Sequence, residues 1–170
     1  MKRILVLGPS GTGKTTLGRR LGEKLHLPIL HLDTVYWLKD WEHIDKPAFH
    51  HWMVDYLRKH DGWVIDGNYT NNRHFDLRLK LADTLILLDY GVDASLKGIH
   101  ERAAKYKHRV RSDMAEGCVE GIDQVFLQYV AFYYKKRIKW LRYKINQFRG
   151  EKTILVFQSR AELHQWFDAL

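Results

Sequence analysis

One eight-residue segment near the start of the chain limits its fold more than any other feature. Residues 8–15 read Gly-Pro-Ser-Gly-Thr-Gly-Lys-Thr and match the pattern G-x-x-x-x-G-K-[ST] at every fixed position. The pattern forms a phosphate-binding loop when a strand precedes it and a helix follows it. Residues 3–7 (RILVL) read as a buried strand, and leucines recur every four residues in 14–26, as on one face of a helix. The sequence therefore predicts a strand, a phosphate loop and a helix, in that order.

Each residue type in this loop has a chemical use in binding ATP with Mg²⁺. Glycines allow the backbone to turn several N–H groups inward toward the phosphates, and the following helix adds the positive end of its dipole. The Lys14 ammonium would reach the β- and γ-phosphates, and the Thr15 hydroxyl would ligate Mg²⁺. We expect the nucleotide contacts of this region to come from Gly8, Pro9, Ser10, Gly11, Thr12, Gly13, Lys14, Thr15 and Thr16.

Short apolar runs alternate with helical stretches along the rest of the chain, a pattern typical of a parallel sheet covered by helices. Four further strands are predicted at 28–32, 62–65, 84–88 and 153–157. No internal repeat or linker interrupts the pattern. We therefore predict one domain over residues 1–170, with a three-layer α/β P-loop fold, a five-stranded parallel sheet and flanking helices.

Capping residues and apolar spacing mark the later helices. Asp45 can cap a helix that has a proline in its first turn, and Asp93 can cap another. Ser159, with Glu162 three positions later, forms a capping box that opens the last helix. The longest helix is predicted at about 122–148, with lysines and arginines on one face. Its other face is an apolar stripe of Phe126, Val130, Tyr134, Ile138, Leu141, Ile145 and Phe148.

Charge and cysteine content limit the binding partners and the cellular compartment that can be expected. Residues 97–152 contain 14 Lys and Arg but only 6 Asp and Glu, so this segment carries the whole net charge of +8. The excess indicates an anionic partner. ATP phosphates would suffice, nucleic acid is a second candidate, and a solvated helix face is a third interpretation. The single cysteine excludes an internal disulfide, and no signal peptide or membrane-spanning run is visible. We expect a cytoplasmic protein with no membrane partner.

Several segments beyond the phosphate loop together resemble one known family. They are residues 31–37 (HLDTVYW), 64–69 (VIDGNY), 78–84 (RLKLADT), 88–89 (LD) and 111–118 (RSDMAEGC). With the loop, they are similar to the bacterial topology modulation proteins (FlaR-related), which belong among the adenylate-kinase-like P-loop kinases. Ser112 departs from this resemblance, because the family pattern has proline there. The resemblance covers nearly the whole chain and implies ATP binding, an acceptor-side helical segment at about 34–60 and a small basic lid at about 103–121.

Two aspartates end predicted strands and are candidates for the reaction site. Asp66 resembles the Asp of the Asp-Gly step in adenylate kinases, and we expect it, with Thr15, to face Mg²⁺; an ordinary strand-ending turn is the alternative. Asp33 lies where kinases of this group bind the acceptor. A carboxylate there can orient a hydroxyl and take its proton, whereas a phosphate acceptor would be served better by an arginine. We therefore favour a hydroxyl acceptor, as in shikimate-kinase-like enzymes, over a loop or cap role for Asp33.

Other side chains are candidates for the acceptor pocket and the lid. Aromatic residues such as Trp37 can stack on a planar acceptor such as a nucleoside or can pack in the core. We expect acceptor contacts from Asp33, Trp37, Asn68, Tyr69, Arg73 and Arg78. Adenylate-kinase-like enzymes carry lid arginines that stabilise charge on the transferring group, which here implies that Arg102, Arg109 and Arg111 act with Lys14 and Asp33. The same resemblance places Ser159 in the loop that contacts adenine.

Together these features predict a kinase that transfers the γ-phosphoryl group of Mg-ATP to a small acceptor, with a hydroxyl favoured. An ATP-regulated nucleic-acid-binding protein is one alternative, motivated by the basic segment and the family name. A nucleoside monophosphate kinase is another, which Asp33 disfavours. The sequence leaves the acceptor's identity and the oligomeric state open.

Overall fold

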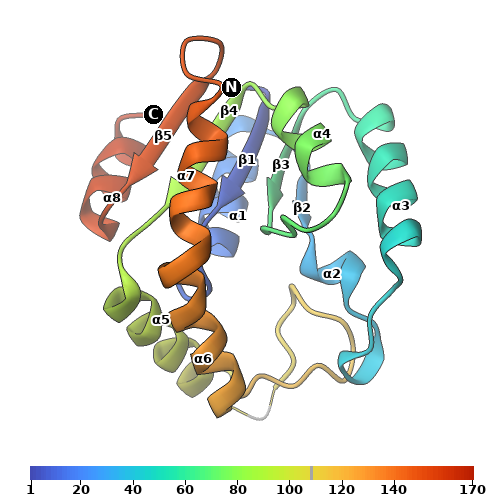
Figure 1. Ribbon diagram of the computed structural model, residues 1–170, viewed down its shortest axis with the longest axis vertical. Coiled ribbons are helices and arrows are strands. Elements are labelled where there is room, and N and C mark those ends of the chain that lie inside the picture. The colour runs from blue at the N-terminus through green and yellow to red at the C-terminus, as the bar shows by residue number, and fades with distance from the viewer. Residues whose placement is uncertain (108) are drawn as a thin grey trace.

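Five strands form the centre of the molecule in the computed structural model, which describes residues 1–107 and 109–170 (Figure 1). They are β1 (Arg3–Leu7), β2 (Ile29–His31), β3 (Trp63–Asp66), β4 (Thr84–Leu88) and β5 (Thr153–Phe157). All four pairings are parallel, in the order β2-β3-β1-β4-β5. The predicted five-stranded parallel sheet is confirmed, and each strand lies within one residue of its predicted bounds.

Helices cover both faces of the sheet and complete three layers (Figure 1). They are α1 (Lys14–Leu25), α2 (Asp33–Tyr36), α3 (Lys46–Lys59), α4 (His74–Leu81), α5 (Val92–Lys105), α6 (Gln124–Phe132), α7 (Ile138–Asn146) and α8 (Arg160–Asp168), with a 3₁₀ turn at Lys39–Trp41. Because successive side chains of a strand point to opposite faces, Leu5 and Leu7 pack with α3, α4 and α7, whereas Ile4 and Val6 pack with α1 and α8. None of the described helices is both long enough and apolar enough to span a membrane.

Two of the three predicted helix caps are confirmed. Asp45 Oδ1 accepts a hydrogen bond of 2.7 Å from the Ala48 N–H at the start of α3, and Ser159 Oγ accepts one of 3.2 Å from the Glu162 N–H at the start of α8. The prediction for Asp93 is wrong, because α5 begins at Val92 and Asp93 lies inside its first turn. The capping position belongs to Gly91, whose φ of +87° suits a residue without a side chain.

The predicted helix at 122–148 is one helical stretch with a change of geometry inside it. Asp123 caps α6 through a 2.7 Å hydrogen bond from the Phe126 N–H, and a π-helical turn at Tyr133–Arg137 separates α6 from α7. A π turn adds a residue to the helical repeat. As a result Tyr133, rather than the predicted Tyr134, is the buried tyrosine that joins the apolar face of α7.

The segment between α5 and α6 crosses the carboxyl ends of the strands and contacts two distant parts of the chain. We call residues 106–121, apart from 108, the lid segment. Its Cys118 Sγ donates to the Leu38 carbonyl oxygen (3.3 Å), and its Ser112 Oγ accepts from Arg19 on α1 (2.9 Å). Figure 1 shows it reaching from α5 toward the loop that follows α2. The segment for which a lid is predicted is thus tied to α1 on one side and to the chain after α2 on the other. Of its predicted range, residues 103–105 belong to α5 and residue 108 lies outside the described residues.

Candidate active site

The phosphate loop has a backbone that favours glycine at three positions. Gly8, Gly11 and Gly13 have φ values of +146°, +81° and +89°, which residues with side chains rarely adopt. The Thr12 hydroxyl, almost fully buried, donates to the Pro9 carbonyl oxygen over 2.8 Å and closes the loop on itself. Gly13 is the capping residue of α1 and offers no side-chain acceptor. The first N–H groups of α1 are therefore available to an anion at this helix terminus.

Helix α5 packs directly against this loop through a second glycine. A Cβ at Gly98 would overlap the Gly11 carbonyl oxygen, and a Cβ at Gly11 would overlap the Ser95 carbonyl oxygen. Backbone therefore contacts backbone at this point. Arg102 follows one helical turn after Gly98, so α5 carries this arginine toward the phosphate loop.

Lys14 lies among charges that oppose one another. Its ammonium donates to the Pro9 carbonyl oxygen (2.9 Å). Desolvation by burial lowers the pKa of Lys14, and the carboxylates of Asp66 and Asp33 act in the opposite direction. A buried ammonium whose charge is costly is stabilised by an anionic ligand. This position suits contact with nucleotide phosphates.

Asp66 ends β3 beside the phosphate loop, where Val6 is its neighbour on β1. Its side chain is buried, and Oδ2 lies 3.2 Å from His31 Nδ1. The two atoms do not meet in hydrogen-bond geometry, and neither has another partner among the described residues. A buried carboxylate oxygen without a partner, close to Lys14 and the loop, fits the ligand preference of Mg²⁺. Thr15, the other predicted ligand, is half-buried in the first turn of α1.

Asp33 opens α2 and receives a short hydrogen bond from the loop after β3. The Tyr69 hydroxyl donates to Asp33 Oδ1 over 2.6 Å, and Tyr69 has a φ of +40°. Burial raises the pKa of Asp33, and the hydrogen bond from Tyr69 opposes that rise. Among the described residues no hydrogen-bond partner is found for Asp33 Oδ2, which leaves this oxygen available to a ligand.

Asn68 and Arg78 have structural roles that differ from those expected. The Asn68 carboxamide makes two hydrogen bonds with Gly8, accepting from its N–H (3.1 Å) and donating to its carbonyl oxygen (2.7 Å). Arg78 is fully buried and donates to the carbonyl oxygens of Gly67 (2.9 Å) and Asn68 (2.8 Å). The prediction that Arg78 contacts an anionic acceptor is wrong, because its guanidinium satisfies the backbone of the turn after β3. Together the two side chains connect that turn to the phosphate loop.

A cavity of about 850 Å³ lies between the phosphate loop, α2, the turn after β3, the lid segment and α6. This volume is typical of small-molecule sites. The structure brings these predicted residues onto its lining: Ser10, Lys14, Asp33, Trp37, Asn68, Tyr69, Arg102 and Arg111. The other predicted residues are not part of its lining: Asp66, Arg73, Arg78, Arg109, Ser159 and, in and just after the phosphate loop, Gly8, Pro9, Gly11, Thr12, Gly13, Thr15 and Thr16. Arg109 is exposed on the lid segment, and the Ser159 hydroxyl is used in capping α8.

The two arginines on the cavity share one carboxylate. Arg102 Nε lies 2.7 Å from Glu120 Oε1, and Arg111 Nε lies 2.7 Å from Glu120 Oε2. Arg111 also donates to Asp113 Oδ2 over 2.7 Å. Glu120 is only 8% exposed. Sequence reasoning missed Glu120, since nothing in the local pattern distinguishes it from other acidic residues of the lid segment.

Aromatic side chains from α6 and the π turn line the same cavity and were also missed. They are Phe126, Tyr129, Phe132 and Tyr133. Trp37 and Trp41, from the acceptor side, line the same cavity. A signal for them exists, because 126, 129, 132 and 133 recur at helical spacing. The predicted apolar stripe instead joins Phe126 to Val130 and Tyr134. The cavity is thus cationic near the phosphate loop and rich in aromatic rings elsewhere.

Comparisons with known proteins identify the fold. No protein-family model matches the sequence, and no curated protein matches it. The structure is similar to shikimate kinase from Acinetobacter baumannii in complex with shikimate, with a TM-score of 0.59 and 16% identity over 99% of this chain and 90% of that chain. It is also similar to a gluconokinase from Sinorhizobium meliloti 1021, with a TM-score of 0.54 and 15% identity over 99% of this chain and 90% of that chain. The predicted three-layer α/β P-loop fold is confirmed.

Proposed function

We propose that the protein is an ATP-dependent kinase that phosphorylates a hydroxyl group of a small molecule. The observation that carries the proposal is that one cavity holds a phosphate-loop lysine, two arginines and an aspartate with a free oxygen. These are the groups that phosphoryl transfer to a hydroxyl requires. The shikimate kinase and gluconokinase that share the fold agree with this assignment. The motifs around Asp33, Asp66 and Arg111 further support a place in the topology modulation family.

The phosphate loop and Lys14 would hold the ATP phosphates, with Thr15 and Asp66 as the groups that hold Mg²⁺. The open terminus of α1 and the unpaired Oδ2 of Asp66 support these roles. Mg²⁺, when bound, neutralises charge on the phosphates. We assign Arg102 and Arg111 to the charge that spreads over the transferring group. Both arginines would then exchange part of their contact with Glu120 for the phosphates.

Asp33 would orient the acceptor hydroxyl and take its proton. The acceptor oxygen forms a bond to the γ-phosphorus as the bond between that phosphorus and the bridging oxygen of ADP breaks, and the hydroxyl proton passes to Asp33. Burial raises the pKa of Asp33, which makes its carboxylate a better proton acceptor than an exposed aspartate. Tyr69 fixes the orientation of the carboxylate through Oδ1. The aromatic lining favours an acceptor with a planar or apolar part.

The test is ADP release from Mg-ATP in the presence of nucleosides, nucleotides, sugars and hydroxy acids. We expect one acceptor class to stimulate release at least tenfold in the wild-type protein. Lys14→Ala should show no stimulation, and Asp33→Asn should lose the stimulation while it still binds ATP. Thermal unfolding of both variants controls for folding. Normal turnover by Lys14→Ala, or slow release that no acceptor changes, would refute the proposal.

A further inference from the structure

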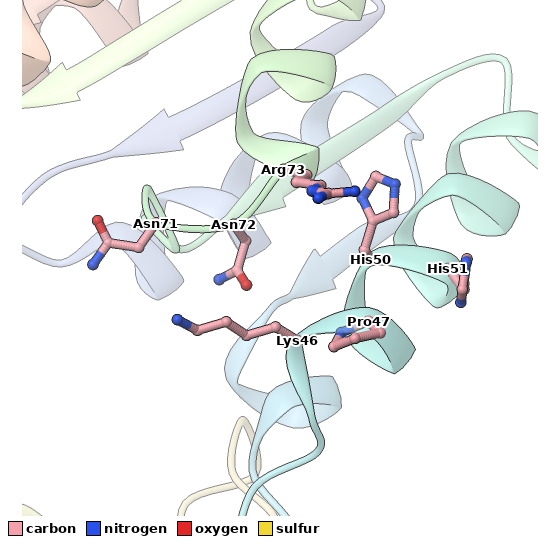
Figure 2. A pocket seen from close by; sticks show the side chains of 7 residues that line it. All are labelled: Lys46, Pro47, His50, His51, Asn71, Asn72 and Arg73. Atoms are coloured by element: carbon pink, nitrogen blue, oxygen red, sulfur yellow. The ribbon is translucent and has the colours of Figure 1, made fainter.

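A second cavity has a volume of about 430 Å³, and Figure 2 shows the side chains that line it. It lies between the first turns of α3 and the loop that precedes α4, and it is lined by Lys46, Pro47, His50, His51, Asn71, Asn72 and Arg73. Lys46, Asn71 and Asn72 also line the larger cavity. The two spaces therefore adjoin, and a molecule seated at Asp33 can extend into the second one.

The lining of this second cavity carries positive charge without a matching carboxylate. Lys46 and Arg73 are cationic, and no acidic side chain is among the lining residues. Within the described part of the chain, neither of the two forms an ion pair. Figure 2 shows Lys46 extending from α3 toward the loop of Asn71 and Asn72, and His50 pointing toward Arg73. Cations from two separate elements thus converge on one space.

Two polar atoms at this cavity are buried and without hydrogen-bond partners among the described residues. They are Nδ1 of His50 and Oδ1 of Asn72. The His50 ring stacks on the ring of buried His74, with centroids 6.4 Å apart and planes 16° apart. Burial, with the neighbouring Arg78, lowers the pKa of His74 to about 3, so His74 is neutral at pH 7. Both atoms have almost no solvent exposure, so the groups that a ligand in this cavity would contact are the exposed side chains of Lys46, Asn71 and Arg73.

The charge of this site comes from its side chains rather than from the helix terminus. The Ala48 N–H of α3 is already bonded to Asp45, and Pro47 has no N–H to offer. Lys46, Arg73 and the amide groups of Asn71 and Asn72 are the donors that remain. They suit a group with several acceptor oxygens and a negative charge.

We infer that this second cavity binds an anionic group of the acceptor, a carboxylate or a phosphate, while the acceptor hydroxyl lies at Asp33. That this anionic group belongs to the acceptor rests on the proposed function, whereas anion binding in the second cavity does not depend on catalysis. The substrate class is then hydroxyl-bearing carboxylic acids or phosphate esters. Neutral sugars and free nucleosides would leave Lys46 and Arg73 without a counter-charge.

The experiment follows the histidine ring resonances by NMR while inorganic phosphate or acetate is added at constant ionic strength and pH. The His50 signal, assigned with His50→Gln, should shift to saturation with at least one of the two anions. Lys46→Gln combined with Arg73→Gln should weaken that response at least tenfold. The matched control combines Arg58→Gln with Lys59→Gln, which removes the same charge from the exposed far end of α3 and should leave the response unchanged. Thermal unfolding of each variant reports whether it folds.

The results separate the possible ligands and the two proposals. Saturation with phosphate alone indicates a phosphate ester, and saturation with acetate indicates a carboxylate. The response should persist in Lys14→Ala. Its persistence would exclude phosphate bound in the phosphate loop as the cause of the shift. The absence of a saturable response, its loss in Lys14→Ala, or equal weakening in the Arg58 and Lys59 control would overturn the inference. An acceptor found by ADP release would in that case still stand, and a His50 response would stand even if no acceptor were found.

Discussion

Replacing Tyr69 with phenylalanine should raise the pKa of Asp33 further above its ordinary value. Burial, the larger influence, already raises the pKa of this carboxyl, and the Tyr69 hydroxyl opposes that rise by donating to Oδ1 across 2.6 Å. A donor stabilises the charged carboxylate, so removing the hydroxyl disfavours the charged form. The sign of the change is therefore upward, and the carboxylate should form at higher pH in the variant than in the wild-type protein.

The size of this change follows from the strength of one hydrogen bond. A hydrogen bond to a charged group contributes roughly 1.5–3 kcal/mol, and one pH unit corresponds to about 1.4 kcal/mol. The titration would move by about one to two pH units if nothing replaced the hydroxyl. Asp33 lines a cavity that water can enter, and water would recover part of the lost interaction. We therefore expect a rise of about one pH unit.

The measurement is a pH titration of the aspartate carboxyl carbons by ¹³C NMR, with Asp33→Asn to assign the signal. The control is Tyr36→Phe. Tyr36 lines the same cavity, its ring centroid is 4.8 Å from that of Tyr69, and its hydroxyl has no hydrogen bond within the described residues. The pKa of Asp33 obtained from this titration should rise in Tyr69→Phe and stay unchanged in Tyr36→Phe. An unchanged or lower pKa in Tyr69→Phe, or an equal shift in the control, would refute the role assigned to this hydrogen bond.

Three further predictions concern stability. Because the folded-state pKa of Asp33 is raised, the stability from this group is lost as the pH rises through that value; Asp33→Asn should therefore resist thermal unfolding better than the wild-type protein at pH 8, and the advantage should vanish near pH 3.8. Asn68→Ala removes both hydrogen bonds to Gly8 and should lower the free energy of unfolding in urea by about 1–3 kcal/mol, while weakening binding of a fluorescent ATP analogue. Glu120→Gln removes the carboxylate between two arginines and should speed tryptic cleavage of the lid segment; unchanged cleavage would contradict its role in holding that segment.

The sheet could be predicted from the sequence because its strands are short apolar runs set between clear turn and helix signals. The interior strand β1 is a continuous run from Ile4 to Leu7, all fully buried, as in sheets covered on both faces. The π turn between α6 and α7 could not be predicted in this way. A π turn has no local sequence marker, and only packing against the sheet on one side and the cavity on the other decides where it falls.

Active-site residues inside the phosphate-loop motif could be placed from the sequence, and residues outside the motif could be misassigned. Lys14 lies where its motif placed it, because the loop geometry is local. Arg78 was misassigned, although on α4 it follows the buried His74 and Phe75 by four and three residues, on the same helix face. An arginine in the middle of an apolar stripe indicates a buried structural group. The backbone carbonyls that it satisfies belong to a turn ten residues earlier, and this partnership is visible only in three dimensions.

The contact between Gly11 and Gly98 has a consequence for where the two arginines of the larger cavity lie. With no room for a Cβ on either side, the backbone of α5 lies directly against the phosphate loop, and Arg102 follows one turn later on the same helix. Arg111 belongs instead to the lid segment, which contacts the chain after α2 through Cys118 and Leu38. The lid segment also contacts α1, because Ser112 accepts a hydrogen bond from Arg19, so the segment that carries Arg111 is connected to both sides of the cavity. Glu120 contacts both arginines and thereby connects α5, which packs on the phosphate loop, to the lid segment.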